Sequence, residues 1–575
     1  MKRASFIQLV LIVIVLILLN VAGNLIFTRI DLTAEKRYTL SPATVELVKN
    51  IDDIVFFKVY LDGNLPANYK KLRDELKQML TEFRSLNSNI QYEFIDPSAS
   101  SDEKERNKIY AELYKDGLNY ATPTEKKKSE VSKQIVWPGA IVSYRNNRVP
   151  MQLIKNQTYA NEEELISRAV NDLEYEMSNA VRKLSIRYAP VLAFIEGHGE
   201  LDSLQTKDAT LALSEYYQVQ RVRIDSNINS LVYRDVKGDS VRIAPKYKAI
   251  IFAKPTEAFS EKEQFIIDQY LMYGGRIFWL IDPLVADLDS IAFQASAMAY
   301  PYDLKVDEML FRYGVRINQH LVTDLRAASI PVVTGQVGNQ PKTQFFKWFY
   351  SPLVFPQINH PIVNNLNAIR FDFSGSIDLV GKDNLKKTVL LQTSEDANTS
   401  GNLPRYTLNV LKQKPSKEDF TKSNLPLAVL IEGQFESFYN RRLAPAMAES
   451  KLINFKETSK PTAIIVVADG DIIRNKIAPN GSIYPLGYDR YTKEMFGNRD
   501  FIVNCVNYLC DDKGLISLRG RTIKLRLLDE EKLAKTAVWQ QVKNVAIPLV
   551  SVWILGIIIF TWRKRKYGAE TIIKS

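Results

Sequence analysis

Cysteine and histidine are scarce in this 575-residue chain, which has only Cys505, Cys510, His198, His320 and His360. The two cysteines are five positions apart in a segment that predicts a helix. Their Cα atoms would then lie about 8–9 Å apart, too far for a disulfide, so we expect both to be core residues. Three histidines leave little material for a histidine-based triad or metal site.

Several sequence motifs of enzymes are also absent. The chain has no G-x-x-x-x-G-K-[ST] motif, which excludes ATP binding by a P-loop. It has no G-x-S-x-G, H-E-x-x-H or C-x-x-C motif, which removes the signatures of a nucleophile elbow, a zinc peptidase and a thioredoxin-type redox pair.

The basic charge is concentrated at the two ends of the chain. The formal net charge is +11, and Lys2, Arg3 and Arg563–Lys566 contribute to it. We find no basic stripe with interleaved aromatic residues in between. Nucleic acid is therefore not an expected partner.

Two long apolar segments predict membrane spans, at Phe6–Phe27 and Val545–Trp562. The first would extend ~33 Å as a helix, enough to cross a bilayer; a cleaved signal peptide is the competing interpretation. Pro548 lies near the start of the second segment, where a helix tolerates proline. Because both outer flanks are basic, both termini should be cytoplasmic and the body periplasmic, with the chain in the inner membrane.

The first apolar segment carries polar and small side chains that a simple anchor does not need. Asn20, Gly23 and Asn24 are predicted to contact a partner helix, because small residues allow close packing and amides bond between helices. The alternative is that the asparagines only lie near the membrane surface.

The N-terminal part of the body predicts a small α/β domain. Strands and helices follow in the order β-α-β-α-β-β, which resembles a thioredoxin-like domain without its redox cysteines. A long helix follows at 161–187. The N-terminal segments are a tail (1–5), a transmembrane helix (6–27), a juxtamembrane stretch (28–44) and this domain (45–160).

The rest of the body predicts a second α/β domain. Buried strands alternate with helices, which indicates a parallel sheet covered on both faces. The remaining segments are the first part of this domain (188–299), an insertion or subdomain (300–460), the second part (461–530), a juxtamembrane helix (531–544), the second span (545–562) and a basic tail (563–575).

Acidic residues and one histidine follow the predicted sheet strands, where open α/β sheets place their ligand crevice. A crevice for a ligand or partner is predicted there, with no metal, no cofactor and no catalytic residue assigned. The alternative is a set of tight turns and helix caps with structural roles. The candidate residues are Glu196, His198, Glu200, Asp282, Asp469 and Asp471.

Short motifs spread over nearly the whole chain resemble those of the gliding-motility-associated auxiliary component of an ABC transporter, the GldG-like family. The resemblance implies a periplasmic glutamine-amidotransferase-like (flavodoxin-like) domain without the catalytic cysteine. It also implies a separate membrane permease and a separate cytoplasmic ATPase as partners. The motifs are Arg37-Tyr38-Thr39-Leu40-Ser41, Glu196-Gly197-His198-Gly199-Glu200, Tyr273-Gly274-Gly275, Ala468-Asp469-Gly470-Asp471 and Gly497-Asn498-Arg499-Asp500-Phe501.

Three functions are compatible with the sequence. The favoured one is a non-enzymatic, substrate-binding-type auxiliary subunit of an ABC transporter that contacts the lipid bilayer and the permease. One alternative is a membrane-anchored periplasmic hydrolase or amidotransferase-like enzyme that uses the segment Glu196–Glu200, called the glycine-histidine loop below. The other is an envelope scaffold protein.

Overall fold

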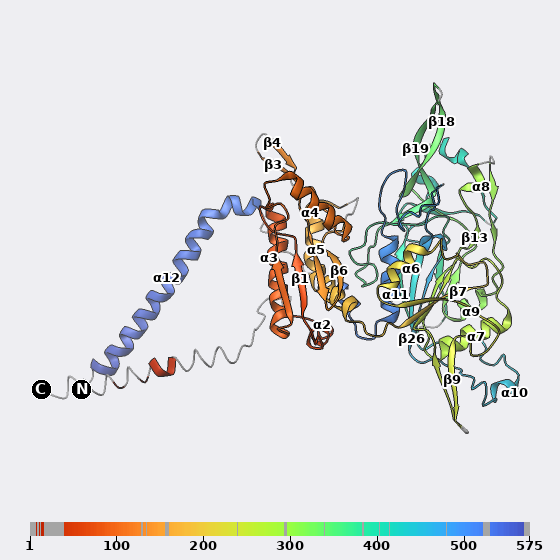
Figure 1. Cartoon of the computed structure of the whole chain (residues 1–575), viewed down its shortest axis with the longest axis horizontal. Helices are drawn as coiled ribbons and strands as arrows, with labels where there is room; N and C mark the ends of the chain where they lie inside the picture. Colours follow the sequence, from red (N-terminus) through yellow and green to blue (C-terminus); the bar gives the residue numbers. More distant parts are fainter. Residues whose placement is uncertain are drawn as a thin grey trace. The chain divides into compact units, whose positions relative to one another are not determined.

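The computed structural model describes most of the chain, in two units, 1–522 and 523–575 (Figure 1). Asn20, Gly23 and Asn24 lie outside the described residues, as does most of the first predicted span. The described residues are 7, 11, 13–16, 39–127, 130–133, 135–155, 160–237, 240–292, 296–338, 340–381, 384–401, 403–412, 415–478, 480–520 and 530–568.

The N-terminal domain contains the predicted β-α-β-α-β-β order, with one short hairpin added. Its four-stranded sheet has the order β2-β1-β5-β6, in which β1 and β2 are parallel and the other neighbours antiparallel. The elements are α2 (Pro42–Lys49), β1 (Val55–Val59), α3 (Ala67–Leu86), β2 (Ile90–Phe94), α4 (Glu103–Lys115), the added β3 (Thr124–Lys127) and β4 (Glu130–Lys133), β5 (Gly139–Tyr144), β6 (Asn147–Gln152) and α5 (Glu162–Ser185).

Apolar residues at helical spacing on α3 and α5 form the core of this domain together with the sheet. Ser41 caps α2, as the Ser-Pro sequence predicts, and its side chain accepts a hydrogen bond from the Thr44 backbone. The buried carboxylate of Glu174 accepts hydrogen bonds from the Ser41 backbone at 2.7 Å and the Thr44 hydroxyl at 2.8 Å. The start of α2 is therefore fixed to α5.

The larger domain is built on a seven-stranded sheet of order β22-β25-β26-β12-β11-β7-β8. The five strands from β26 to β8 are parallel, as the alternating strand and helix pattern predicts. The strands are β7 (Val191–Glu196), β8 (Gln218–Arg223), β11 (Ala249–Ala253), β12 (Ile277–Leu280), β22 (Lys386–Gln392), β25 (Pro426–Gly433) and β26 (Thr462–Val467).

Helices cover both faces of this sheet. The helices α6 (Lys207–Ser214) and α11 (Asn498–Cys510) pack on one face, and α7 (Glu261–Met272) and α9 (Asp307–Arg312) on the other. The predicted capping box of Ser260 and Glu263 begins α7. Two separate apolar cores result, one on each side of the sheet.

The predicted division at 300–460 needs a correction. Both β22 and β25 come from this segment, yet they extend the central sheet at one edge. Strand β25 pairs antiparallel with β26, and β22 pairs antiparallel with β25. The sheet is therefore mixed, because the chain returns to it before β26. The other strands between β8 and β25 are β9 (Val232–Lys237), β10 (Ser240–Pro245), β13 (Leu284–Val285), β14 (Ala297–Met298), β15 (Tyr300–Pro301), β16 (Val315–Ile317), β17 (Val322–Asp324), β18 (Ala327–Val337), β19 (Gln340–Val354), β20 (Ile369–Arg370), β21 (Ile377–Leu379), β23 (Ala397–Thr399) and β24 (Arg405–Tyr406).

Strands that the sequence analysis missed form small sheets around the central one. The hairpins β9–β10 and β18–β19 extend from opposite ends of the domain (Figure 1). The predicted polar loop at 396–422 contains β23, β24 and two short 3-10 helices, Leu408–Lys412 and Lys417–Asp419. The remaining elements of this unit are the helices α8 (Asp289–Ala292) and α10 (Pro445–Ala448) and the 3-10 helices η3 (Asp471–Ile473) and η4 (Ile516–Gly520).

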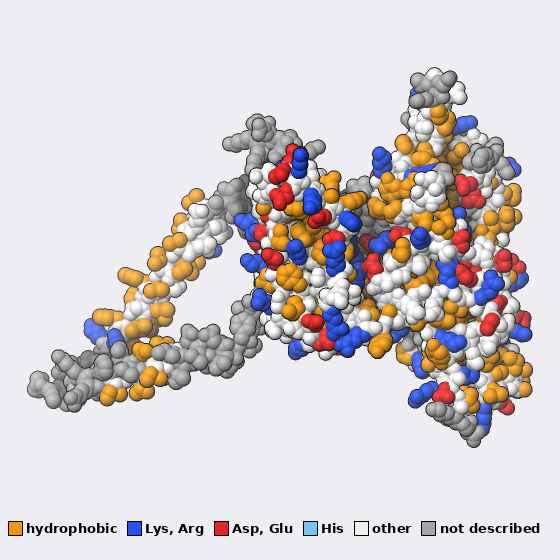
Figure 2. All heavy atoms as spheres, viewed as in Figure 1, with side chains coloured by type: hydrophobic (Ala, Val, Ile, Leu, Met, Phe, Trp, Pro, Cys, Tyr) orange, Lys and Arg blue, Asp and Glu red, His pale blue; other side chains and the backbone are white. Residues whose placement is uncertain are grey.

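The second unit contains one helix, α12 (Glu530–Gly568), in place of the predicted juxtamembrane helix and separate span. Pro548 was predicted to lie near the start of a helix, but it lies inside α12, well after the helix begins at Glu530. Among the described residues, Val538–Arg565 is the stretch long and apolar enough to cross a membrane. Its apolar side chains are exposed, as Figure 2 shows along the helix.

Asp268 attaches the long excursion between β12 and β26 to α7. This fully buried carboxylate accepts hydrogen bonds from the Tyr313 hydroxyl at 2.8 Å, the Ser437 hydroxyl at 2.7 Å and the Phe438 backbone at 2.7 Å. Burial raises the pKa of Asp268, and these donors oppose the shift. The carboxylate also accepts a hydrogen bond from the Gln269 side-chain amide at 2.9 Å, so removing it would take an acceptor from four donors.

We therefore expect Asp268→Ala to lower the free energy of unfolding by about 2–4 kcal/mol, because buried donors would remain unsatisfied. Denaturant unfolding of the full chain in detergent, followed by tryptophan fluorescence, measures the change. Asp303→Ala is the control, since that side chain is 75% exposed. Equal stability of the two variants would contradict this role of Asp268.

Candidate functional site: a carboxylate cluster at the carboxyl end of the sheet

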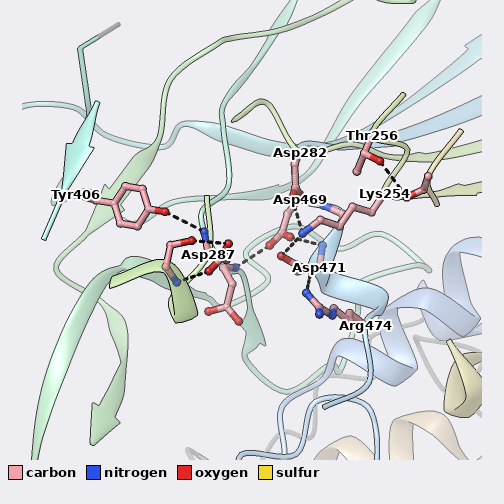
Figure 3. A network of polar contacts seen from close by, with 12 residues as sticks. Lys254, Thr256, Asp282, Asp287, Tyr406, Asp469, Asp471 and Arg474 are labelled. Atoms are coloured by element: carbon pink, nitrogen blue, oxygen red, sulfur yellow. Dashed lines mark hydrogen bonds and ion pairs between the residues drawn. The ribbon is translucent and has the colours of Figure 1, made fainter. Parts of the chain in front are cut away.

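Three aspartates meet where two neighbouring parallel strands end. Asp282 follows β12, and Asp469 and Asp471 follow β26. One carboxylate oxygen from each lies within 4.8 Å of those from the other two. Asp282 and Asp469 are buried, at 4% and 0% exposure, and Figure 3 shows all three converging. The predicted placement of these residues at one edge of the sheet is thus observed.

Lys254 lies between the aspartates and supplies the cation of the cluster. Its Nζ is 2.9 Å from Asp282 Oδ2 and 2.6 Å from Asp471 Oδ2 (Figure 3). Lys254 follows β11 and has a φ of 57°, a left-handed conformation that costs a non-glycine residue about 1–2 kcal/mol. A Cβ atom on Gly470 would lie 2.5 Å from Lys254 Cβ, so only glycine fits there.

Asp469 is held mainly by backbone groups. Its two carboxylate oxygens accept hydrogen bonds from the backbone N–H of Asp372 at 2.7 Å and of Asp471 at 2.8 Å. Asp372 in turn contacts the Arg370 guanidinium at 3.1 Å, and Arg370 contacts Asp489 at 2.6 Å. The cluster therefore extends into a buried network that joins the sheet to two other segments.

The cluster holds its charges through mutual compensation. Burial raises the pKa of Asp282 to about 6, an effect that Asp471 reinforces and Lys254 opposes. Burial also raises the pKa of Asp469 well above its usual value, with Asp282 adding to the shift. For Lys254 burial lowers the pKa, but Asp282 and Asp471 outweigh it and the pKa is raised. The lysine ammonium thus occupies the position that a metal ion would need.

The second group of candidate residues has a different role. The His198 ring lies between two carboxylates, with Nδ1 3.3 Å from Glu200 Oε1 and Nε2 3.2 Å from Glu263 Oε1. It stacks on Phe259, with 3.8 Å between ring centroids. Burial lowers the pKa of His198, but its hydrogen bonds to the carboxylates of Glu200 and Glu263 outweigh this effect and the pKa is raised. Glu196 pairs instead with Arg221.

The glycine-histidine loop is fastened to the loop after β11. The His198 carbonyl accepts hydrogen bonds from the backbone of Thr256 at 2.8 Å and Glu257 at 2.9 Å. Gly199 has a φ of 70°, and a Cβ atom there would lie 2.0 Å from Thr256 Oγ1. The loop after β11 also contains Lys254. It therefore contacts both the glycine-histidine loop and the carboxylate cluster at the same end of the sheet.

Sequence reasoning missed Lys254 and Glu263 as members of these groups. A signal for Lys254 was present, since it directly follows a buried strand, one residue nearer to the strand end than Asp282 and Asp469 are to theirs. Glu263 was recognised only as a helix cap. Cys505 and Cys510 are free and buried in the core, as predicted, and burial raises the pKa of both thiols.

We expect Lys254→Met to lower the free energy of unfolding by about 3–5 kcal/mol at pH 7.5, because it leaves buried carboxylates without their cation. The loss should be smaller at pH 5. Burial raises the pKa of Asp282 to about 6, so protonation of this carboxyl below about pH 6 removes its uncompensated charge.

Denaturant unfolding at the two pH values measures this difference. Lys248→Met is the matched control, because Lys248 forms an ion pair with Asp512, whose side chain is 56% exposed, and such pairs contribute about 0–1 kcal/mol. A loss for Lys254→Met that is no larger than the control, or that does not change with pH, would contradict the ionic role of the cluster.

Comparison with known proteins places the chain among transport-system components. It is 21% identical over 569 residues to an uncharacterized protein of Borreliella burgdorferi, covering 96% of each chain. A solved structure titled "mmIFT52 N-terminal domain" is 13% identical and covers 56% of this chain and 97% of that one, with a TM-score of 0.30, too low to support an argument.

Two family models match the chain. One, described as a domain of unknown function, matches residues 34–143. The other, described as "ABC-type uncharacterized transport system", matches residues 189–505, which contain the central sheet, the carboxylate cluster and the glycine-histidine loop. The chain therefore belongs to this family of ABC transport-system auxiliary components.

Proposed function

We propose that this chain is a non-enzymatic auxiliary subunit of an ABC transporter, anchored in the inner membrane, with a periplasmic body that acts through contacts with its partners. The family supports an accessory role in transport in general. The observation that carries the non-enzymatic part is the ion pair of Lys254 with Asp282 and Asp471, which fills the end of the sheet where an α/β enzyme would hold its ligand.

Other groups that a hydrolase could use are also engaged or buried. His198 is enclosed by Glu200, Glu263 and Phe259, and both cysteines lie in the core. No G-x-S-x-G motif supplies a serine nucleophile. These observations favour a body that binds partners and does not catalyse a reaction. They argue against the hydrolase and amidotransferase alternatives.

The membrane anchoring in the proposal has two parts. The exposed apolar stretch Val538–Arg565 supports the C-terminal span, and Trp562 and Arg563–Lys566 suit its cytoplasmic end. The span at 6–27 and the contact of Asn20, Gly23 and Asn24 with the permease rest on the sequence alone. With both spans, the termini are cytoplasmic and the body periplasmic.

The finer family assignment is also part of the proposal. The motif set resembles the GldG-like components associated with gliding motility, whose partners are a membrane permease and a cytoplasmic ATPase. The strand order β2-β1-β5-β6 is compatible with a thioredoxin-like N-terminal domain. The parallel part of the central sheet is compatible with a glutamine-amidotransferase-like domain that lacks a catalytic cysteine.

Co-purification tests the transporter assignment. The tagged full chain, solubilised in mild detergent, should recover a multi-span permease and an ATPase bearing a P-loop. Replacing residues 6–27 with polyleucine should keep the chain in the membrane but reduce permease recovery, because packing groups are lost. Recovery of neither subunit by the unaltered chain would contradict the assignment.

A second experiment separates the proposal from the hydrolase alternative. His198→Ala should change no amide or ester hydrolysis, because we expect none in the unaltered chain. It should lower the free energy of unfolding by about 1–3 kcal/mol, since Glu200 and Glu263 lose their shared partner.

The pH dependence of that loss is fixed by the pKa shift of the histidine. The folded-state pKa is raised, so the ionic contribution is fully present below pH 6.5 and is lost as the pH rises through the folded value. The variant should therefore lose more stability at pH 6 than at pH 9. Hydrolysis by the unaltered chain that disappears in His198→Ala would contradict a non-enzymatic role.

A further inference from the structure

A polar cavity of about 480 Å³ lies within the first unit, bordered by the N-terminal domain and the larger domain. Its volume is in the range of small-molecule sites, roughly 300–1,000 Å³. Helix α5 contributes Glu176 and Lys183, α11 contributes Arg499 and Asp500, and the segment after β6 contributes Lys155. Glu215, together with Arg519 of η4, completes the charged lining.

Two of the charged pairs in this cavity are already satisfied within the chain. Lys155 Nζ is 3.0 Å from Glu176 Oε1, and Lys183 Nζ is 2.5 Å from Glu215 Oε2. Within each pair the two charges neutralise each other, so neither pair needs a ligand. Arg499 lies farther from its carboxylate neighbours, at 3.5 Å from Asp208 and 3.7 Å from Glu215.

Asp500 is a lining anion without a direct partner. Among the described residues, its carboxylate makes no hydrogen bond and no ion pair of 4 Å or less. Burial raises the pKa of Asp500, but the nearby cations Lys155 and Arg519 outweigh it, and the pKa is lowered. The carboxylate is therefore ionised at neutral pH and has unused acceptor capacity.

Arg519 is the complementary case. This guanidinium is 3% exposed, and its direct acceptors are uncharged: Asn504 Oδ1 at 3.1 Å and the Asn364 carbonyl at 2.8 Å. Its Nε has no hydrogen-bond partner. The guanidinium lies over the Tyr175 ring, 5.1 Å from the centroid, which adds an aromatic wall. A buried guanidinium without a directly bonded carboxylate is the usual recognition group for an incoming one.

We propose that this cavity binds a small zwitterion, an amino acid or short peptide with free termini, whose ammonium pairs with Asp500 and whose carboxylate pairs with Arg519. The charges of such a ligand match two lining groups, Asp500 and Arg519, that make no direct ion pair within the described residues. The tyrosine and aliphatic walls, including Tyr175, Tyr216 and Val503, accommodate its apolar part. The site lies apart from the carboxylate cluster of Lys254.

This inference deepens the proposed function, because it gives a transport subunit a ligand class, and it rests on that function for its biological meaning. The binding itself is measured on the purified chain alone. Failure to bind a zwitterion would leave the co-purification result intact, and failure of co-purification would leave the binding result intact.

Thermal unfolding of the detergent-solubilised full chain, followed by intrinsic fluorescence, tests the proposal. The probes are L-alanine and L-alanyl-L-alanine, with the same dipeptide blocked at both termini as the matched control. A zwitterion at roughly ten times its Kd should raise Tm by on the order of 2 °C, because it binds only the folded state. The blocked dipeptide should give no shift.

Asp500→Asn keeps the shape of the side chain and removes its charge. It should weaken the affinity for the zwitterion about tenfold or more, since a charge-assisted hydrogen bond is lost. Asp512→Asn, outside the cavity, should bind like the unaltered chain. Arg519 is not substituted, because its bonds to Asn364 and Asn504 also support the fold.

Three results would overturn the proposal: no shift of the unaltered chain with either zwitterion, an equal shift with the blocked dipeptide, or unchanged affinity in Asp500→Asn. The first two do not depend on any variant, so a folding defect in Asp500→Asn would not protect the proposal.

Discussion

The ion pairs of the Lys254 ammonium with Asp282 and Asp471 are the interaction on which the carboxyl end of the central sheet depends. The partners of Lys254 follow two different strands, so one cation joins the ends of β11, β12 and β26. Three carboxylates this close would repel one another strongly without it. The unfavourable backbone conformation of Lys254 and the requirement for glycine at position 470 are consequences of placing the ammonium there.

Hydrogen bonds and ion pairs also connect the carboxylate cluster to segments outside the central sheet. The Asp469 carboxylate accepts a hydrogen bond from the backbone of Asp372. The Asp372 carboxylate forms an ion pair with Arg370, and Arg370 forms a second ion pair with Asp489. On the other side, the loop that carries Lys254 holds the His198 carbonyl. Removing the cation would therefore disturb several segments that are distant in sequence.

Much of the fold follows from local patterns in the sequence. The strands at β7, β11 and β26 are continuous runs of buried residues, and α3 and α5 have apolar residues at helical spacing, so each was predicted with nearly correct bounds. The antiparallel strands β22 and β25 were not placed in the sheet, because strand pairing across the long excursion depends on contacts that no local pattern encodes. The helix from Glu530 to Gly568 was divided in two because the apolar run that marks the predicted span begins only at Val545.

The site was predictable as a location but not as a chemical arrangement. Strand ends indicated Asp282, Asp469 and Asp471. The pairing with Lys254, and the separate enclosure of His198 by Glu200 and Glu263, depend on three-dimensional positions. The charged cavity beside Asp500 had no signal beyond a short motif, because its groups come from α5, α11 and η4.

Adding Mg²⁺ or Ca²⁺ to the purified full chain during thermal unfolding tests whether Lys254 supplies the cation that the carboxylate cluster needs. We expect no change in Tm at millimolar concentrations, because the ammonium already lies between Asp282 and Asp471. A rise of a few degrees, of the size expected when a ligand binds only the folded state, that disappears in Asp471→Asn would contradict this role of Lys254.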